Sequence, residues 1–240
     1  MTACLCEQIK KIIFQKQQIF PLLEDISFEV QEGEVYMITG PSRCGKSTLL
    51  RIIGGLLKPT SGTVSVFGLN LFDMNERSAS DFRLRNIGYV FETSSLIDSL
   101  SLFDNIAVPM RLVGISSPLI ETRVLEILGQ IGMVDQKNQY PTQISEGEKS
   151  LICIARALVL LPKLLILDEP TLHLDHPTGV KIFTHIRELA YDHQITIISA
   201  TTDIRLHPFA DRVAKMKEGK ISMVAGEPST KENELPFLKL

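Results

Sequence analysis

The sequence predicts an α/β fold in which a mainly parallel sheet is wrapped by helices. The first observation is a short apolar strand, residues 35–39, which leads through a glycine-rich loop into an apolar-periodic helix, residues 46–56. The second is the apolar run 164–167, which has the composition of a strand buried on both faces of a parallel sheet. The third is the alternation of strands and helices along the chain, which places helices on the faces of one sheet.

The remaining elements follow in chain order. Further strands are expected at 9–14, 26–30, 62–68, 86–91, 195–199, 212–216 and 220–224. Further helices are expected at 101–112, 119–133, 150–160 and 178–191. We expect one domain over residues 1–224, with a helical subdomain at about 95–160, and a loosely ordered tail at 225–240.

Composition bounds the class of protein. The chain has 240 residues, of which 44% are hydrophobic, so it can bury a large core. A net charge of −3 gives no electrostatic footprint for nucleic acid. The four cysteines have no pairing pattern, and the first residues have no signal-peptide pattern, so a cytoplasmic protein is expected. No apolar run reaches the roughly 18 residues of a membrane span. Any path through a membrane must therefore come from separate subunits.

The loop at residues 40–47 reads Gly-Pro-Ser-Arg-Cys-Gly-Lys-Ser, the complete pattern of a phosphate-binding loop. Between a strand and a helix, such a loop directs successive backbone N–H groups at a bound anion. Lys46 could reach the outer phosphates of a nucleotide, and the Ser47 hydroxyl could bind Mg²⁺. The alternative is a glycine-rich turn that matches by chance. The nucleotide-binding candidates here are Gly40, Pro41, Ser42, Arg43, Cys44, Gly45, Lys46, Ser47 and Thr48.

Two carboxylates follow the apolar run 164–167. Ligands of parallel sheets bind at the carboxyl ends of the strands, where Asp168 and Glu169 stand. Asp168 would hold Mg²⁺ through water, and Glu169 could polarise an attacking water molecule. A strand that merely ends in a polar turn is the alternative. The presence of Lys46 earlier in the chain favours the functional interpretation.

A third motif identifies a family resemblance. Residues 143–149 read Gln-Ile-Ser-Glu-Gly-Glu-Lys and precede a helix, and the turn 173–175 follows the Asp-Glu strand. This order of motifs resembles the ATP-binding-cassette (ABC) transporter family over residues 20–222. The resemblance implies a P-loop NTPase (RecA-like) core with an N-terminal antiparallel β subdomain and an α-helical subdomain. It also implies ATP and Mg²⁺ as cofactors and ATPase activity.

The same resemblance implies an assembly. In this family two cassettes dimerise head to tail, and each ATP lies between one subunit's phosphate loop and the other's signature segment. Ser145, Gly147 and Asp175 are therefore nucleotide-binding candidates. The implied partners are a second cassette, in a homodimer or a heterodimer, and integral membrane permease subunits, which would place the chain on the inner face of the cell membrane. Phe14 is the candidate for stacking on adenine and Phe20 the alternative, with a core phenylalanine equally open.

Several positions depart from the family pattern. Glu92 replaces a glutamine; it could still bind Mg²⁺, but it brings a negative charge toward the γ-phosphate. Thr202 replaces a histidine and cannot carry positive charge. Glu146 and Glu148 place carboxylates in the signature segment. We expect a catalytic set of Lys46, Glu169, Glu92 and Thr202 and a metal set of Ser47, Asp168 and Glu92. We also expect slow turnover if the two cassettes of the dimer are identical. The alternative is that each change is tolerated.

The phosphate loop has its own departure at Arg43, where the family usually has glycine. Glycine permits backbone angles that other residues resist, so an arginine here indicates an accessible conformation or some strain. Cys44 next to it faces the helix N-terminus and is expected to be a reactive thiol.

Two stretches narrow the choice of transporter. Residues 86–109 resemble the cassettes of phospholipid-trafficking (mammalian-cell-entry-type) systems, and residues 141–159 equally resemble lipoprotein-release, cell-division and macrolide-export cassettes. We expect a lipid or lipoprotein cargo, or alternatively a hydrolysis-poor regulatory or structural cassette. A soluble repair or translation cassette is disfavoured. Residues 92–109 would form the socket for a membrane partner. The apolar candidates in it, for which core packing is the alternative, are Leu96, Ile97, Leu100, Leu102 and Phe103.

Overall fold

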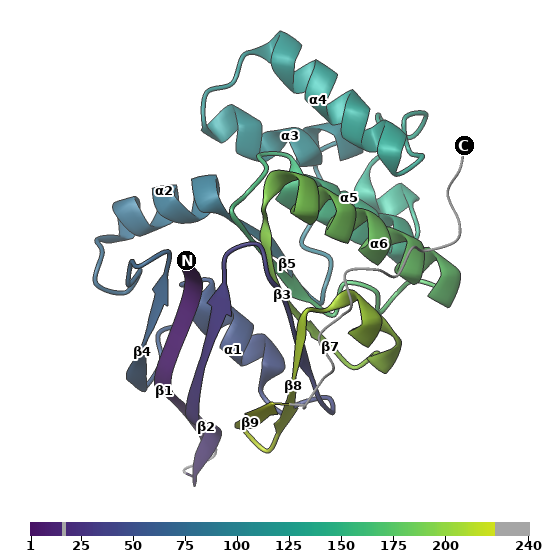
Figure 1. The fold of residues 1–240 in the computed structure, drawn as a ribbon. Helices are drawn as coiled ribbons and strands as arrows, with labels where there is room; N and C mark the ends of the chain where they lie inside the picture. The colour runs from purple at the N-terminus through teal and green to yellow at the C-terminus, as the bar shows by residue number, and fades with distance from the viewer. Residues whose placement is uncertain (16–17, 224–240) are drawn as a thin grey trace.

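The computed structural model describes residues 1–15 and 18–223, and the predicted tail at 225–240 lies outside them. Two antiparallel strands open the chain (Figure 1). β1 (Thr2–Gln15) pairs with β2 (Gln18–Gln31) on one side and with β4 (Ser61–Val66) on the other. Both β1 and β2 are longer than the sequence predicts. Their pairing contains register shifts, and these break the alternation by which strands are recognised.

The second sheet has six strands in the order β5-β6-β7-β3-β8-β9. All neighbouring pairs are parallel except β8 with β9, which confirms the mainly parallel sheet. Every residue of β3, β6 and β7 is buried, as their apolar composition predicts. The strands are β3 (Val35–Thr39), β5 (Ile87–Val90), β6 (Leu164–Asp168), β7 (Thr196–Thr201), β8 (Arg212–Lys217) and β9 (Lys220–Met223).

The described residues form six α-helices. They are α1 (Lys46–Ile53), α2 (Glu76–Asn86), α3 (Leu102–Leu112), α4 (Ser117–Gln130), α5 (Glu146–Leu158) and α6 (His176–His193). Short 3₁₀ helices occupy Pro141–Gln143 and Ile204–Phe209. The sequence did not reveal α2, because Ala79 is its one buried residue and no apolar stripe marks it. Among the described residues, no helix is long and apolar enough to cross a membrane.

Three hydrophobic clusters hold these elements together. The first lies between the two sheets around α1, and the second lies on the other face of the six-stranded sheet, under α5 and α6. The third joins α3, α4 and α5, which we call the helical lobe and which stands above the sheet in Figure 1. Helix α5 serves two clusters at once, since Cys153 and Ile154 face the sheet while Ile152 and Ala155 face the helical lobe. The lobe is therefore fixed to the sheet through α5.

The segment between β5 and α3 is anchored by a buried asparagine. Asn105 is fully buried, and its amide nitrogen donates to the carbonyl oxygens of Ile97, Leu100 and Ser101 at 3.0–3.1 Å. Its side-chain oxygen accepts from the Ile97 N–H at 2.8 Å. Through these contacts one side chain ties the backbone of the segment before α3 to the first turn of that helix.

Gly88 in β5 is packed against α5, so a substitution there tests how closely α5 is packed on the sheet. A Cβ atom on Gly88 would lie 2.4 Å from the Ala157 carbonyl oxygen, whereas one on Gly129 in α4 would have its nearest neighbour, Val134 Cγ2, at 3.9 Å. We expect Gly88→Ala to lower the free energy of unfolding by about 2–3 kcal/mol, because backbone must move. The matched Gly129→Ala should raise it by up to about 1 kcal/mol. Urea unfolding measures both; equal effects would contradict this packing.

Candidate functional site

Three adjacent strands deliver the predicted site residues to one edge of the sheet. The order β6-β7-β3 places β7 between the strand that precedes the phosphate loop and the strand that ends in Asp168. Glu169 follows β6 directly, and Thr202 follows β7. The carboxyl ends of these parallel strands therefore bring together residues that lie more than 150 positions apart in the sequence.

The phosphate loop has the backbone of an anion cradle. Arg43 adopts the left-handed region with φ 66°, which confirms that this arginine occupies a conformation usually left to glycine. Gly45 has φ 110° and precedes α1, and no side chain caps this helix N-terminus. Uncapped N–H groups at the start of a helix attract an anion. The residues present therefore fit the phosphates of ATP.

The loop is supported from behind by the C-terminal hairpin. A Cβ atom on Gly40 would lie 2.1 Å from the Met216 carbonyl oxygen, so β8 leaves no room for a side chain there. In the turn between β8 and β9, the Gly219 N–H donates to the Cys44 carbonyl oxygen at 3.3 Å. Two points of the loop are thus fixed by residues from the end of the described chain.

Lys46 is buried beneath the loop and is held by three oxygen atoms. Its side chain is 5% exposed. The ammonium donates to the carbonyl oxygens of Gly40 at 2.9 Å and Pro41 at 3.2 Å, and it pairs with Glu169 Oε1 at 3.3 Å. A buried ammonium needs such partners, because its loss of hydration is otherwise uncompensated. A phosphate entering the loop would compete with these oxygens for the same cation.

Asp168 and Ser47 form the second contact of the site. The Ser47 hydroxyl donates to Asp168 Oδ1 at 3.0 Å, while the buried Oδ2 atom has no partner among the described residues. The pKa of Asp168 is raised to about 6, mainly by burial; the Ser47 hydrogen bond opposes this rise, and the charges of Glu92 and Glu169 add to it. A hydroxyl and an unpaired carboxylate oxygen are hard ligands of the kind that Mg²⁺ prefers. These residues therefore fit a magnesium ion.

Glu169 is held on both sides. Its Oε2 atom accepts from the Thr202 N–H at 2.9 Å and from the Thr202 hydroxyl at 3.3 Å, while Oε1 faces Lys46. Glu169 also has a left-handed backbone, with φ 48°. The Thr202 contact escaped the sequence analysis, which considered only that this side chain cannot carry positive charge. The contact forms because β6 and β7 are neighbours in the sheet, which the order of the strands along the chain does not show.

Glu92 stands at the edge of the same site. It is exposed just after β5, the strand next to β6, and its charge helps to raise the pKa of Asp168. The structure thus brings Glu92 toward the expected metal ligands without a direct hydrogen bond to them among the described contacts.

The signature segment begins α5 with a capping box. Ser145 Oγ and Ser145 N both donate to Glu148 Oε2, at 2.7 and 2.8 Å, and the Glu148 N–H donates back to Ser145 Oγ. These bonds from Ser145 hold the pKa of Glu148 below its usual range. Glu148 therefore has a local structural role that the sequence analysis did not assign, although the Ser-x-x-Glu spacing could have indicated it.

Glu146 is the exposed carboxylate of this segment. It pairs with Lys149 at 2.6 Å and accepts a hydrogen bond from Ser94 at 3.4 Å. The Lys149 hydrogen bond is the main reason that the pKa of Glu146 is lowered. Gly147 lies against the turn 173–175, where an added Cβ would be 3.3 Å from the His173 carbonyl oxygen.

Asp175 begins α6 and is engaged locally. Its carboxylate accepts from the Thr178 N–H at 3.0 Å and the Thr178 hydroxyl at 2.8 Å, which makes it the N-cap of the helix. Among the described residues, no hydrogen bond joins Ser145 or Gly147 to the phosphate loop of the same chain.

Cys44 corrects one expectation. Its side chain is 7% exposed and belongs to the core cluster around α1, so it is not the accessible, reactive thiol that its place beside a helix N-terminus suggested. The loop turns this side chain inward, where a Cβ on Gly40 would be 3.1 Å from the sulfur atom. Phe20 is 43% exposed, and the side chain of Phe14 lies outside the described part of the structure.

The predicted socket for a membrane partner is also partly corrected. Leu102 is fully buried and Leu96 packs against two core clusters, so both belong to the core. Phe103 packs at the edge of the helical lobe, whereas Ile97 is 42% exposed. Burial follows from the turn of α3, which points Leu102 inward, and from the Asn105 anchor that draws the loop against the lobe.

Comparison with known proteins agrees with this geometry. A family model described as "ABC transporter" matches residues 23–172. The "Putative hemin import ATP-binding protein HrtA" of Staphylococcus aureus (strain Newman) is 38% identical over 220 residues, covering 92% of this chain and 99% of the relative. The protein of the same name from strain N315 is 40% identical over 201 residues, which are 84% of this chain and 90% of the relative.

Two solved structures have the same fold. The ATP-binding cassette MJ0796, in a dimeric post-hydrolysis state bound to ADP and Pi, gives a TM-score of 0.88 at 30% identity, over 93% of this chain and 100% of that one. CbiO1 from Clostridium perfringens, part of the ABC transporter complex cbiONQ, gives a TM-score of 0.78 at 30% identity, over 92% of this chain and 87% of that one. Fold, motif order and site geometry agree, and the chain belongs to the ABC transporter family as an ATP-binding cassette and an ATPase.

Proposed function

We propose that this chain is the ATP-hydrolysing subunit of a transporter for an amphipathic cargo, that it works as a cassette dimer on separate membrane subunits, and that its turnover is slow. One observation carries the proposal. Lys46, Ser47, Asp168 and Glu169 converge at one edge of the sheet, so the cation, the metal ligands and the catalytic carboxylate of a nucleotide hydrolase stand together.

In this proposal ATP binding reorganises the contacts of Lys46. The ammonium turns from the Gly40 and Pro41 carbonyl oxygens to the outer phosphates, and this releases Glu169 Oε1. Thr202 continues to hold Oε2, so Glu169 stays oriented while its freed oxygen accepts a proton from the attacking water. Magnesium bound with the nucleotide would neutralise phosphate charge, and Ser47 and Asp168 would hold it.

Slow turnover follows from charge around the γ-phosphate. Charge that develops in the transition state is stabilised by positive or neutral donors placed in advance. Glu92 adds a negative charge. Thr202 donates both its hydroxyl and its N–H to Glu169, so neither donor faces the γ-phosphate. Glu146 presents an exposed carboxylate to the partner's nucleotide, although Lys149 offsets part of its charge.

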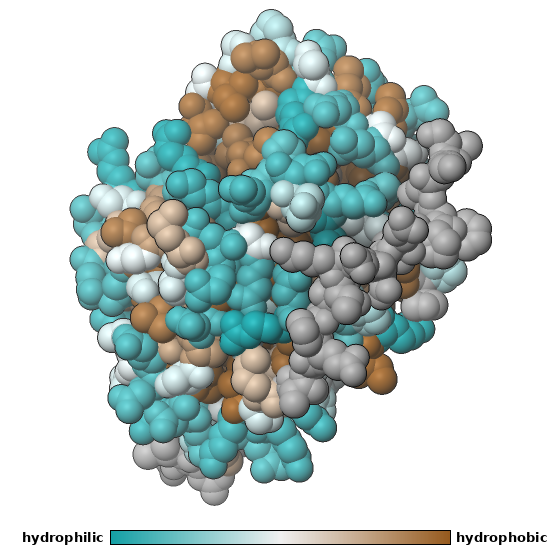
Figure 2. Space-filling view, viewed as in Figure 1, coloured by the Kyte–Doolittle hydropathy of each residue, from teal (hydrophilic) through white to brown (hydrophobic). Residues whose placement is uncertain are grey.

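Two features support the proposed dimer and membrane partner: the signature residues and an exposed apolar surface. Ser145 and Gly147 serve no nucleotide within their own chain, and the similar cassette MJ0796 is dimeric. Figure 2 shows hydrophobic residues gathered at the top of the visible face, over α3 and α4. Leu112 and Leu119, on either side of the turn between these helices, are 67% and 62% exposed. An apolar surface of this kind suits a protein partner.

Arg156 links the signature helix, α5, to the segment that follows β5. From α5, its guanidinium donates to the carbonyl oxygen of Ser95 at 3.0 Å and to the Ser95 hydroxyl at 2.8 Å. The segment that begins at Glu92 in the nucleotide site is therefore held by α5 and, through Asn105, by α3. We infer that a membrane subunit docks on this segment and senses movement of α5.

The proposed cargo is a molecule that partitions into the membrane. The sequence resemblances favour a lipid or lipoprotein, whereas the S. aureus relatives are named for hemin import. Hemin and lipids share a large apolar body with attached anionic groups. We propose this shared chemistry, with hemin as the first cargo to test.

Turnover is tested by restoring the family residues. The triple variant Thr202→His, Glu92→Gln and Glu146→Gly should raise the steady-state ATPase rate of the purified chain by about 10²-fold or more, because each missing donor can cost about 10²–10³. The same triple variant carrying Glu169→Gln should lose the gain. Fast wild-type hydrolysis that the restorations leave unchanged would contradict the proposal.

Asp168→Asn tests how far the buried carboxylate lowers the free energy of unfolding. A folded pKa of about 6, above the usual 3.8, means that ionisation destabilises the nucleotide-free protein at pH values above 6. Removing the charge should therefore raise the free energy of unfolding by about 2 kcal/mol above pH 7, and this gain should vanish as the pH falls from 6 to 4.

The same variant should bind Mg²⁺·ATP at least about tenfold more weakly, since a metal ligand is lost. Exposed Asp135→Asn is the control and should change neither quantity. Equal stability of wild type and Asp168→Asn at pH 5 and pH 8 would show that Asp168 carries no buried charge.

Docking is tested with Ile97→Glu in membranes that contain the cognate permease. The cassette should co-sediment about tenfold less, because a charge replaces an exposed apolar contact, while ATP binding is retained. Leu56→Glu, with similar exposure outside this region, is the control. In the reconstituted complex, hemin should stimulate hydrolysis more than added phospholipid; stimulation by phospholipid alone would move the cargo to the lipid class.

A further inference from the structure

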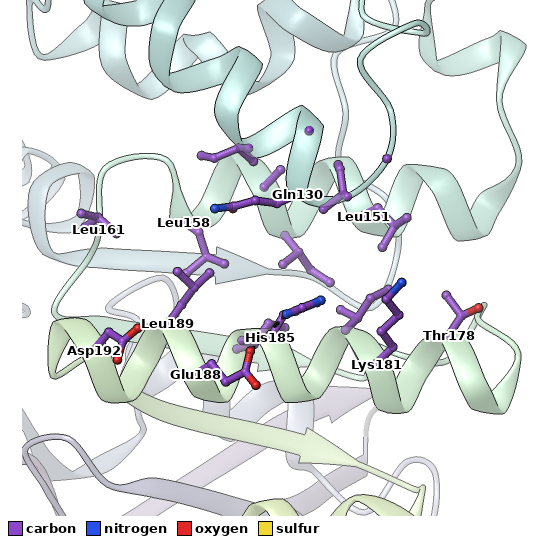
Figure 3. A pocket seen from close by; sticks show the side chains of 18 of the residues that line it. Gln130, Leu151, Leu158, Leu161, Thr178, Lys181, His185, Glu188, Leu189 and Asp192 are labelled. Carbon is purple, nitrogen blue, oxygen red and sulfur yellow. Dashed lines mark hydrogen bonds and ion pairs between the residues drawn. The ribbon is translucent and has the colours of Figure 1, made fainter. Parts of the chain in front are cut away.

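A cavity of about 660 Å³ opens between the helical lobe and α6, away from the phosphate loop (Figure 3). Helices α4 and α5 form one wall, and α6 forms the other. No residue of the phosphate loop lines it. Its volume lies within the range of about 300–1,000 Å³ that small-molecule sites occupy.

The inner surface of the cavity is apolar and is built by all three helices. Its main apolar contributors are Ile127 from α4, Leu151, Ile154 and Leu158 from α5, and Ile186 and Leu189 from α6. Because Ile127, Ile154, Leu158 and Ile186 are also core residues, this surface is fixed by the fold. An apolar ligand body would find a preformed surface here.

Polar groups line both walls of the cavity, and the carboxylates of Glu188 and Asp192 are among them. Figure 3 shows the side chains of Lys181, from α6, and Gln130, from α4, directed into the space between the helices. Neither side chain has a hydrogen bond or ion pair with another described residue. The other basic groups of the lining are engaged: Arg123 pairs with Glu126 at 2.9 Å, and His185 contacts Glu188 at 3.2 Å.

We propose that this cavity binds an amphipathic monocarboxylate. The apolar body lies against the leucine and isoleucine side chains. The ligand carboxylate accepts from the Lys181 ammonium, whose charge it offsets. A dianion would need a second free cation, and Arg123 is already paired. The site goes beyond the proposed transport function and does not depend on its cargo.

Occupancy would connect two elements of the nucleotide machinery. The signature residue Ser145 is the N-cap of helix α5, and Asp175 is the N-cap of α6. A ligand in contact with both helices restrains the helical lobe against α6 and thereby acts on the partner-facing residues without touching the catalytic edge.

The test uses the full-length, nucleotide-free chain and decanoate below its micellar concentration, measured by isothermal titration calorimetry. We expect saturable one-to-one binding, with decanol and decyltrimethylammonium at least about tenfold weaker. Lys181→Met keeps the apolar stem and should weaken decanoate binding about three- to tenfold. Exposed Lys58→Met, outside the cavity, should leave binding unchanged.

A second variant blocks the cavity instead of removing charge. Gly129 lines it and has room for a side chain, so Gly129→Leu should fill the space and abolish binding. Urea unfolding should be used to check that both cavity variants remain folded. Equal binding of the three decyl compounds, unchanged affinity in Lys181→Met, binding that does not saturate near one equivalent, or no decanoate binding would each overturn the proposal.

Discussion

The buried ammonium of Lys46 constrains the geometry of the whole nucleotide edge. Removing this cation from water is costly unless oxygen atoms surround it, and two loop carbonyls with Glu169 provide them. Glu169 in turn needs donors for its second oxygen, and Thr202 supplies them from the neighbouring strand. The loop curvature, the end of β6 and the end of β7 are therefore coupled by charge compensation. Asp168 Oδ2 is the exception, a buried polar atom left unpaired where a metal ion would bind.

The sequence predicted those parts of the fold that local pattern determines. Apolar runs marked β3 and β6, and the glycine spacing marked the phosphate loop. Features that depend on tertiary neighbours were not predictable. Helix α2 has no apolar stripe, and Cys44 turns inward because β8 and the core accept it. The contact between Thr202 and Glu169 needs β6 and β7 to be adjacent, which the order of elements in the chain does not reveal.

Helix α5 connects the signature segment, the six-stranded sheet and the helical lobe. Its first turn carries the capping box at Ser145, its middle packs on both the sheet and the helical lobe, and Arg156 near its end holds Ser95. A well-packed helix transmits displacement along its length because its neighbours resist deformation. The signature segment, the loop after β5 and the lobe are therefore connected through one helix, and the exposed carboxylate of Glu146 lies in its first turn.

The support behind the phosphate loop has a consequence for biosynthesis. Residues 40–47 leave the ribosome early, yet the carbonyl of Met216 and the N–H of Gly219, against which the loop rests, are made about 170 residues later. Strand β3 likewise acquires its neighbours β7 and β8 only from the last quarter of the chain. Contacts of such sequence separation close slowly and late. A nascent or C-terminally truncated chain therefore carries the complete loop sequence without the backbone geometry that makes it a nucleotide site.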